Sequence, residues 1–333
     1  MEKSIFITGG AGYIGSHIAK LFLESGYKAV IFDNLSTGFK EAVEKLSSIG
    51  SLVFEEGDLL DYERIKSALQ KHKPDCVVHC GALLSVDESM KFPEKYFKNN
   101  VGGSMNLFEA MKETGIKNIV FSSTCAVYGE IEDNPVSERH PTSPTNPYGE
   151  TKLIIEQMLR WYGKLSEINY AILRYFNVCG ASSDGLIGDG RIPPPHLIQR
   201  AVRGGLGIDS FEFTCPEMDT PDKTPVRDYI DVEDIAEAHK RSYETLLING
   251  KSGIYNVGTG KGNSVKEIVS KVEEVLGVSI PKEEGEKRKG EYAKVYADNT
   301  KLKKDFGWVP ERNIEESIRK LVSWYKEHPN GYK

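Results

Sequence analysis

A tyrosine and a lysine stand four positions apart in the segment NPYGETK, as Tyr148 and Lys152. Residues at this spacing share one face of a helix, so the lysine ammonium could stabilise a neighbouring tyrosinate and form an acid/base pair. The same spacing recurs as Tyr62 and Lys66 in DYERIK, where no other residue type suggests a site. The spacing alone is therefore weak, and its meaning depends on the elements that position it.

A glycine-rich turn near the N-terminus gives a stronger signal for a ligand. The segment TGGAGYIGSH follows a short apolar run and precedes a helical pattern, and it satisfies GxxGxxG through Gly9, Gly12 and Gly15 and GxGxxG through Gly10. Glycines let the backbone turn tightly and approach a pyrophosphate, whose charge meets the N-terminus of the following helix. In this strand–turn–helix context the motif predicts a dinucleotide site.

An acidic residue at the end of the second expected strand indicates which dinucleotide is bound. Asp33 follows Gly15 by 18 positions, where a carboxylate accepts hydrogen bonds from the adenosine ribose and repels a 2′-phosphate. We therefore expect NAD rather than NADP. Asp58, in EGDL at the end of the third strand, is either an adenine contact or a turn-capping residue.

Short apolar strands alternate with amphipathic helices through the first half of the chain. This alternation predicts an α/β fold with a Rossmann-type, doubly wound parallel sheet. Gly115 is a candidate helix C-cap, and Asn146 followed by Pro147 is typical of a helix start. Strands are expected at 4–9, 29–34, 52–58, 75–82, 118–124 and 169–177, and helices at 17–25, 62–72, 93–114 and 147–162.

The pattern becomes less regular after residue 178. Residues 180–195 are rich in Gly and Pro and predict a loop, and 263–277 predicts an amphipathic helix. With roughly 100–200 residues per domain, the 333 residues fit two units. We expect an NAD-binding Rossmann domain over 1–178 and a smaller C-terminal α+β substrate lobe over 179–333, with segments around 226–258 returning to the first domain.

Composition excludes several classes of protein. The net charge is −6 with scattered basic residues, which argues against a nucleic-acid surface. No apolar run reaches the ~18 residues of a membrane span, and MEKSIFITGG lacks the apolar core of a signal peptide. The five cysteines form no CxxC pair, so we expect free thiols in the cytoplasm and no bound metal.

Taken together, these motifs resemble the extended short-chain dehydrogenase/reductase family, and within it the group of UDP-glucose 4-epimerases. The resemblance extends from Ile5 to the C-terminal HPNGY. Its marks are TGGAGYIGSH, FDNLS, EGD, KNNVGGSMNL, FSSTCAVYG, NPYGETK, LRYFN, VRDYI and YNVGTGKGNSV. It implies an isomerase that inverts C4 of a UDP-hexose (UDP-glucose/UDP-galactose) through a transient 4-keto sugar and retains its NAD.

The resemblance makes Tyr148 the catalytic acid/base, with Lys152 holding the nicotinamide ribose and Thr124 bonding to the sugar 4-hydroxyl. A free phenol has a pKa of about 10, and lowering it by about 3 units requires about 4 kcal/mol of preferential stabilisation of the anion. We expect Lys152 and the positive nicotinamide ring to supply it. Related dehydratases carry an Asp-Glu pair where this chain has Cys125 and Ala126, so removal of water is disfavoured.

The resemblance also implies two sets of binding residues. The NAD set is Gly9, Gly12, Tyr13, Ile14, Gly15, Asp33, Asn34, Leu35, Ser36, Thr37, Gly38, Asp58, Leu59, Gly81, Ala82, Leu84, Asn99, Tyr148, Lys152, Tyr175 and Phe176. The UDP-sugar set is Thr124, Tyr148, Asn177, His196, Leu197, Arg227, Arg288, Glu291 and Val295.

Four departures from the family pattern bear on the substrate. Glu291 stands where the family has Asp, Leu84 where relatives often have Lys, and the loop 214–225 is atypical. Val295 stands where some members carry Tyr, and the smaller side chain leaves room near C2. We therefore expect N-acetylated UDP-hexoses (UDP-GlcNAc/UDP-GalNAc) to be accepted as well.

Three other functions stay open at this point. They are a 4-epimerase of UDP-pentoses or UDP-uronic acids, a net oxidoreductase that releases NADH, and a catalytically silent NAD-binding protein. The intact Thr124, Tyr148 and Lys152 disfavour the last. Apolar positions on helices 93–114 and 147–162 either pack on the protein's own core or form a dimer interface, and we expect a homodimer, as the family commonly forms.

Overall fold

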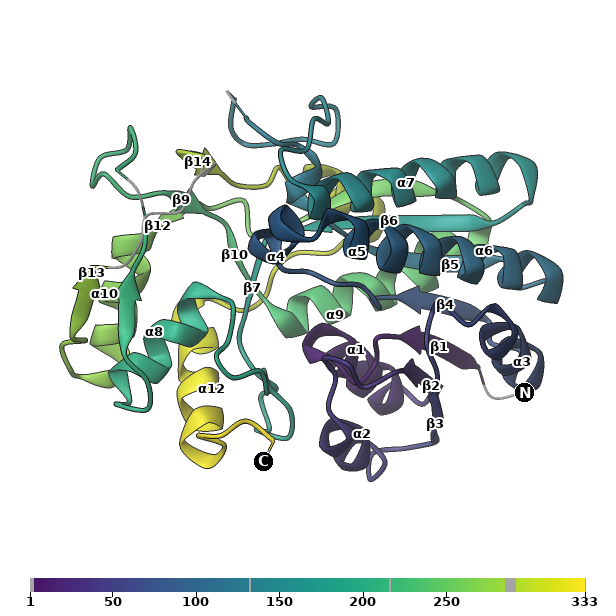
Figure 1. The fold of residues 1–333 in the computed structure, drawn as a ribbon, viewed down its shortest axis with the longest axis horizontal. Helices are drawn as coiled ribbons and strands as arrows, with labels where there is room; N and C mark the ends of the chain where they lie inside the picture. The colour runs from purple at the N-terminus through teal and green to yellow at the C-terminus, as the bar shows by residue number, and fades with distance from the viewer. Residues whose placement is uncertain (1–2, 132, 216, 285–291, 333) are drawn as a thin grey trace.

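A seven-stranded parallel sheet forms the centre of the computed structural model, which describes residues 3–131, 133–215, 217–284 and 292–332 (Figure 1). Its strand order is β11-β6-β5-β4-β1-β2-β3, and every neighbouring pair is parallel. The prediction of a doubly wound parallel sheet is confirmed. The strands are β1 (Ser4–Thr8), β2 (Lys28–Asp33), β3 (Leu52–Glu56), β4 (Cys76–His79), β5 (Asn118–Thr124), β6 (Asn169–Tyr175) and β11 (Gly253–Val257).

Two layers of helices cover the sheet, because successive strand side chains point to opposite faces. Ile5 and Ile7 of β1 pack in one apolar cluster with residues of α1 and α9, whereas Phe6 packs in a second cluster with α3, α6 and α7. Helices of these layers are α1 (Tyr13–Glu24), α2 (Lys40–Leu46), α3 (Tyr62–His72), α6 (Gly103–Thr114), α7 (Pro147–Leu165), α9 (Val232–Arg241) and α11 (Thr300–Phe306).

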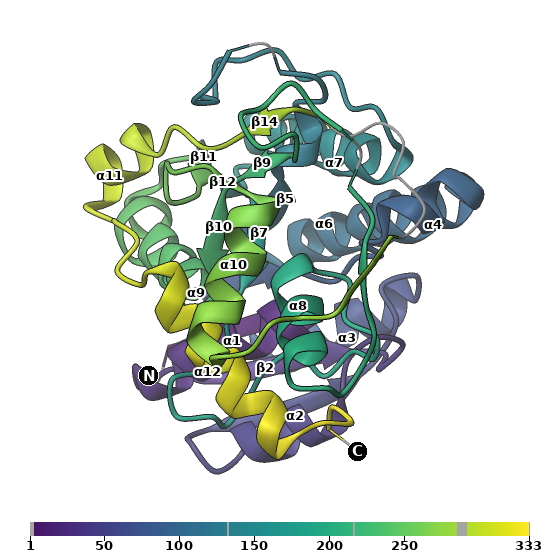
Figure 2. The same ribbon diagram turned by 90° about the vertical axis from the view of Figure 1, so that its left-hand side faces the viewer.

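Parts of the second half of the chain build a smaller lobe beside the C-terminal ends of the strands (Figures 1 and 2). Its core joins α8 (Leu197–Gly205), α10 (Val265–Leu276) and α12 (Ile314–Glu327) around Ile268, Trp324 and Tyr325. Small sheets link it to the main body, built from β7 (Asn177–Cys179), β8 (Phe211–Phe213), β9 (Val226–Arg227), β10 (Tyr229–Asp231), β12 (Asn263–Ser264), β13 (Lys282–Glu284) and β14 (Lys294–Val295).

The expected helix 93–114 is not one regular helix. It runs as α5 (Pro93–Tyr96), a π-helical turn η1 (Phe97–Gly102) and then α6. In η1 the Asn100 amide bonds to both backbone groups of Leu83, accepting from N–H at 2.8 Å and donating to the carbonyl at 3.0 Å. The wider turn therefore ties the segment after β4 to the helical layer. The remaining short helices are α4 (Val86–Lys91), η2 (Cys125–Val127), η3 (Ser242–Leu246) and η4 (Leu247–Asn249).

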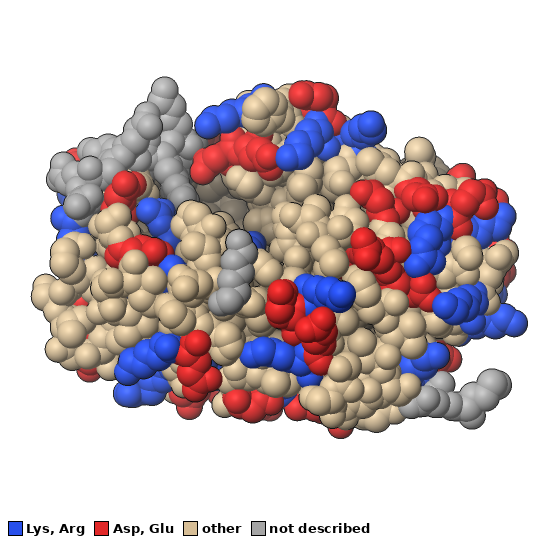
Figure 3. Space-filling model, turned by 60° about the horizontal axis from the view of Figure 1, so that its bottom comes forward, with Lys and Arg blue, Asp and Glu red and all other residues tan. Residues whose placement is uncertain are grey.

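The surface mixes charges of both signs. On the face drawn in Figure 3, Lys and Arg side chains lie interspersed with Asp and Glu. Among the described residues, none of the helices combines the length and the apolar character that crossing a membrane requires.

Candidate active site

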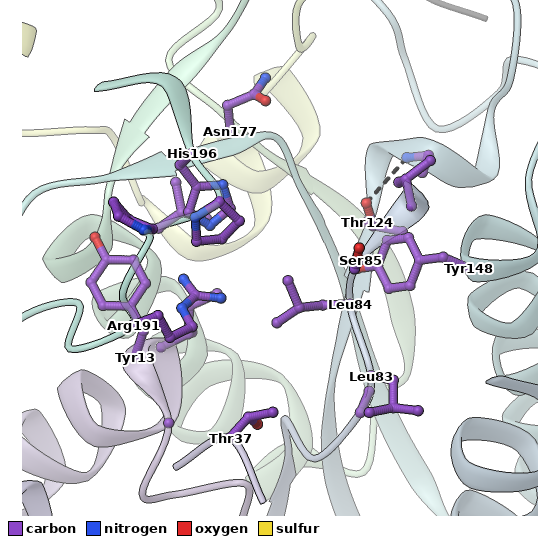
Figure 4. Close-up of a pocket in the computed structure, with 18 of the residues that line it drawn as sticks. Tyr13, Thr37, Leu83, Leu84, Ser85, Thr124, Tyr148, Asn177, Arg191 and His196 are labelled. Atoms are coloured by element: carbon purple, nitrogen blue, oxygen red, sulfur yellow. Dashed lines mark hydrogen bonds between the residues drawn. The ribbon is translucent and has the colours of Figure 1, made fainter. Parts of the chain in front are cut away.

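A cavity of about 850 Å³ lies between the sheet and the smaller lobe. Its walls include the residues that follow β1, β2, β4, β5 and β6. Parallel α/β sheets bind ligands at this edge, where the strands end and the helices begin. Figure 4 shows Thr124 and Tyr148 on one side of the cavity, with Tyr13, Arg191 and His196 on the other.

The glycine-rich turn has the geometry that a pyrophosphate requires. Gly9 has a φ of +67°, and a Cβ added at Gly15 would lie 2.2 Å from the Gly9 carbonyl oxygen. Helix α1 begins after Gly12 without a side-chain cap, and its first turn carries no acidic residue. The amide groups and the positive end of the helix dipole are thus left for an anion. These residues fit the pyrophosphate of NAD.

Carboxylates at the ends of β2 and β3 line the same end of the cavity. Asp33 accepts hydrogen bonds from the backbone N–H groups of Ala11 (3.0 Å) and Leu35 (2.8 Å), which fix its orientation. Burial raises the pKa of Asp33. Asp58 accepts from the Asn34 amide at 2.8 Å and from the Leu60 N–H, so it also caps a local turn. The two carboxylates offer acceptors to an adenosine, as expected for NAD.

Thr124, Tyr148 and Lys152 meet where β5 ends and α7 begins. Asn146 caps α7 by accepting from Gly149 N–H at 2.9 Å, and this start places Tyr148 in the first turn, with Lys152 one turn further. The Thr124 hydroxyl accepts from Ala126 N–H at 3.2 Å. Thr124 also acts on the Tyr148 phenol, because it lowers the pKa of that group. The three residues that the sequence singled out are therefore brought together.

The electrostatics of this trio differ from our expectation. Burial raises the pKa of Tyr148 to about 12, and Thr124 lowers it only in part. Burial also lowers the pKa of Lys152 to about 8. The Lys152 ammonium donates to the Ser122 carbonyl at 2.9 Å and lies 4.9 Å from the Phe121 ring centroid. In the protein's own groups, burial thus outweighs any lowering of the phenol pKa, which we expected Lys152 and the nicotinamide ring to supply together.

A buried ion pair lies next to the trio and joins β5, β6 and α7. The Arg174 guanidinium donates to both carboxylate oxygens of Glu156, at 2.9 and 2.5 Å, and the Ser123 hydroxyl donates to Glu156 at 2.5 Å. Arg174 and Glu156 are both almost fully buried. A buried pair with two parallel hydrogen bonds of this kind fixes the elements it connects, which here carry Thr124 and Tyr148.

The expected UDP-sugar residues lie on the lobe side of the cavity. Asn177, His196, Leu197, Arg227 and Val295 all line it. The Asn177 amide donates to the Asp228 carbonyl at 3.2 Å. The Arg227 guanidinium donates to the Tyr292 carbonyl at 2.8 Å. Two further predicted residues, Arg288 and Glu291, lie outside the described residues.

Nearly all of the expected NAD residues line the cavity, and two do not. Leu35 packs against the apolar cluster beneath β1 and β2. A Cβ added at Gly38 would lie 2.8 Å from the Ala11 Cβ and 3.0 Å from Asp33 Oδ1, so Gly38 packs against these two residues and does not line the cavity. The others are present along the cavity, from Gly9 and Asp33 to Asn99 and Phe176.

A family model extends over most of the chain. The model described as "NAD dependent epimerase/dehydratase family" matches residues 5–258, which include the glycine-rich turn, the trio and the strands that carry them. The chain belongs to the NAD dependent epimerase/dehydratase family. The cofactor in the family's description, NAD, is the dinucleotide that the glycine-rich turn and Asp33 fit.

Individual members of this family are similar over nearly the full length. A UDP-glucose 4-epimerase of Lactobacillus helveticus is 39% identical over 330 residues, covering 98% of each chain. The crystal structure of UDP-glucose-4-epimerase from Stenotrophomonas maltophila with bound NAD and formylated UDP-arabinopyranose is 34% identical, with a TM-score of 0.94, covering 98% of this chain and 99% of that one. The UDP-Glc/GlcNAc 4-epimerase of Campylobacter jejuni is 38% identical, with a TM-score of 0.84 and the same coverage.

Several residues that line the cavity of this family member carried no signal in the sequence. Arg191 comes from the Gly- and Pro-rich loop 180–195, where an isolated charge reads as a solvated side chain. Tyr292 lies beside Val295 and forms a hydrogen bond with Thr145, two residues before the start of α7. Spacing along the chain cannot reveal such residues, because their approach to the site depends on how the lobe packs.

Proposed function

We propose that the protein catalyses the NAD-dependent 4-epimerisation of UDP-hexoses, interconverting UDP-glucose and UDP-galactose. The observation that carries this proposal is the meeting of Thr124, Tyr148 and Lys152 in the cavity that also holds the glycine-rich turn. The three relatives described above are all named as UDP-sugar 4-epimerases. We further propose that residues 1–178, joined by returning segments around 226–258, form the NAD-binding domain and that the remainder of 179–333 forms the UDP-sugar-binding lobe.

In this mechanism Tyr148 removes the proton from the 4-hydroxyl of the sugar and later returns it. Thr124 holds that hydroxyl by a hydrogen bond, next to the phenol whose pKa Thr124 lowers. Bound NAD would supply the acceptor and donor of the hydride at C4, and the positive charge of its nicotinamide ring would favour the phenolate form of Tyr148. Lys152 adds positive charge from one helical turn away and orients the nicotinamide ribose.

Dehydration is disfavoured because the positions after Thr124 carry no acid or base for it. Cys125 and Ala126 line the cavity here. Burial raises the pKa of the Cys125 thiol to about 12, so it stays neutral at physiological pH. Loss of water from the sugar requires a group that protonates a leaving hydroxyl, and a thiol that remains so weak an acid does not serve that role.

The sugar specificity includes N-acetylated hexoses in our proposal. Val295 lines the cavity in a cluster with Leu153, Phe176 and Tyr292, and a valine leaves more space than a tyrosine there. The similar Campylobacter protein is named for both UDP-Glc and UDP-GlcNAc. Activity on UDP-pentoses is a second candidate, which the UDP-arabinopyranose derivative in the Stenotrophomonas structure favours.

We also propose a homodimer in the cytoplasm. Phe97, Met105 and Trp161, on η1, α6 and α7, are exposed by 37%, 49% and 61%, and these elements lie together on one side of the sheet (Figure 1). Exposed apolar side chains on neighbouring helices are typical of an interface. The five free cysteines agree with a reducing compartment. Light scattering of the protein and of Met105→Glu/Trp161→Glu tests the dimer.

The decisive experiment incubates the protein with a panel of UDP-sugars and follows the configuration at C4 by NMR. We expect UDP-glucose and UDP-galactose to interconvert without a lasting rise of absorbance at 340 nm. Tyr148→Phe serves as the inactive control and should lose about 100- to 10,000-fold in rate. Steady NADH release, or equal rates for the Phe variant and the parent, would overturn the proposed function.

A further inference from the structure

Arg191 reaches the glycine-rich turn from the opposite lobe. Its guanidinium carbon lies 5.7 Å from the centroid of the Tyr13 ring, and Tyr13 is the first residue of α1, directly after Gly12. Both side chains line the cavity, and Figure 4 shows them close together. The loop 180–195 thus brings a cation to the side chain of the first residue of α1, in the same cavity as the glycine-rich turn that fits a pyrophosphate.

A buried carboxylate holds this guanidinium in one orientation. Asp189 is fully buried and accepts from Arg191 Nε and from one terminal N–H, both at 2.7 Å. Burial alone would raise the pKa of Asp189, but the Arg191 guanidinium and its hydrogen bonds outweigh burial and keep that pKa below its usual value. The pair is therefore charged at neutral pH.

The guanidinium keeps donors for a ligand. An arginine has five N–H groups, and the two bonds to Asp189 use two of them. The Arg191 side chain is 19% exposed, whereas Asp189 is buried completely, so the part of the guanidinium turned away from Asp189 borders the cavity. Arginine in this fixed, forked geometry is suited to phosphate oxygens.

The C-terminal segment keeps the loop in place. The Tyr325 hydroxyl donates to the Asp189 carbonyl at 3.4 Å, and the Tyr332 hydroxyl accepts from Gly188 N–H at 3.1 Å. A Cβ added at Gly190 would lie 2.3 Å from the Tyr332 ring, so that ring packs directly against the loop. Arg191 is thus preorganised, and little conformational entropy remains to be lost when a ligand binds.

We propose that Arg191 binds the pyrophosphate of NAD from the side opposite the glycine-rich turn, so that both lobes grip the cofactor. This inference rests on the NAD site of the proposed function. NAD is favoured over the diphosphate of the UDP-sugar because Arg191 lies against Tyr13, in the turn that binds the dinucleotide. This second contact strengthens the retention of NAD. Tight retention is required because the same cofactor molecule must return the hydride that it has accepted.

Titration calorimetry of cofactor-stripped Arg191→Met with NAD, ADP-ribose and UDP tests the inference. We expect binding of NAD and of ADP-ribose, which shares the pyrophosphate, to weaken about 10- to 100-fold, as for loss of a charge-assisted hydrogen bond. UDP affinity should stay within about threefold. Arg319→Met, which removes an exposed arginine of α12, is the matched control and should bind NAD like the parent.

The outcomes separate this inference from the proposed function. Unchanged NAD affinity, or a loss confined to UDP, overturns the role of Arg191 whether or not the protein epimerises sugars. Because Arg191→Met leaves Asp189 buried and unpaired, the double variant Asp189→Asn/Arg191→Met carries the same test if the single variant unfolds. A folded double variant that binds NAD as tightly as the parent equally refutes it.

Discussion

The Lys152 ammonium donates a hydrogen bond to the backbone carbonyl of Ser122, at 2.9 Å, two residues before Thr124. This bond ties α7 to the end of β5 and gives the buried charge a partner. Lys152 is 4% exposed, and burial lowers its pKa from the usual 10.5 to about 8. Lys152 therefore affects both the position of the acid/base residues and the stability of the folded protein.

The first prediction concerns the pH dependence of folding. Between pH 8 and about 10.5 the unfolded chain carries a proton on Lys152 that the folded protein has lost, so the free energy of unfolding rises with pH in this window. Lys152→Met lacks this contribution. We expect the stability difference, parent minus variant, to rise by about 3 kcal/mol from pH 8 to 10.5. Urea melts of NAD-free protein at several pH values measure it, and a pH-independent difference would show that Lys152 titrates normally.

The second prediction concerns the hydroxyl of Thr124. Thr124→Ala removes the hydroxyl that lowers the pKa of Tyr148 and that accepts from Ala126 N–H. We expect kcat to fall by about 100-fold, as for loss of one positioned polar group, while stability falls by only about 1 kcal/mol. Thr124→Ser keeps the hydroxyl and should retain kcat within about threefold. Equal activity of the Ala and Ser variants would remove Thr124 from the mechanism.

The parts of the site that could be predicted from the sequence are those that local chemistry determines. Gly9 adopts a φ of +67°, which favours glycine, and Asn146 with Pro147 starts α7 where the sequence indicated. The alternation of strands and helices then predicts that the glycines, Asp33 and Tyr148 lie at the same edge of the sheet. Each of these features is determined by residues within a few positions of one another.

Other parts depend on packing between distant segments. The π-helical turn around Asn100 has apolar spacing too close to that of an α-helix to be distinguished in the sequence. The partner of Lys152 is a backbone carbonyl, which no side-chain pattern reveals. Arg191 approaches Tyr13 because segments distant in sequence hold the loop 180–195, through the bond between Tyr332 and Gly188 and the bond from Tyr13 to the Gly180 carbonyl.

The third prediction tests the glycine-rich turn. A Cβ at Gly15 would meet the Gly9 carbonyl oxygen at 2.2 Å and the Gly10 Cα at 2.9 Å, both backbone atoms that no rotamer change can move away. Gly15→Ala should therefore open the turn, destabilise the protein by about 1–3 kcal/mol and weaken NAD binding. Thermal melts with and without NAD measure both effects.

The matched control for that variant is Gly50→Ala. Gly50 is exposed, and the nearest heavy atom to an added Cβ there lies at 3.5 Å, an ordinary contact. We expect this variant to melt like the parent and to gain the same stabilisation from NAD. A Gly15→Ala protein with parental NAD affinity would contradict the close approach of the turn to the cofactor.

The last prediction concerns sugar size and Val295. This side chain is 5% exposed and lines the cavity beside Leu153 and Phe176. Val295→Tyr adds a ring in the space proposed for the substituent at C2, so kcat/KM for UDP-GlcNAc should fall by at least about 10-fold through steric exclusion. UDP-glucose should lose less than about threefold. Val295→Ala is the control, and it should keep both activities because it only enlarges the space. Coupled assays with the two sugars give the ratio directly, and a Tyr variant that slows both sugars equally would place Val295 outside the region that selects the sugar.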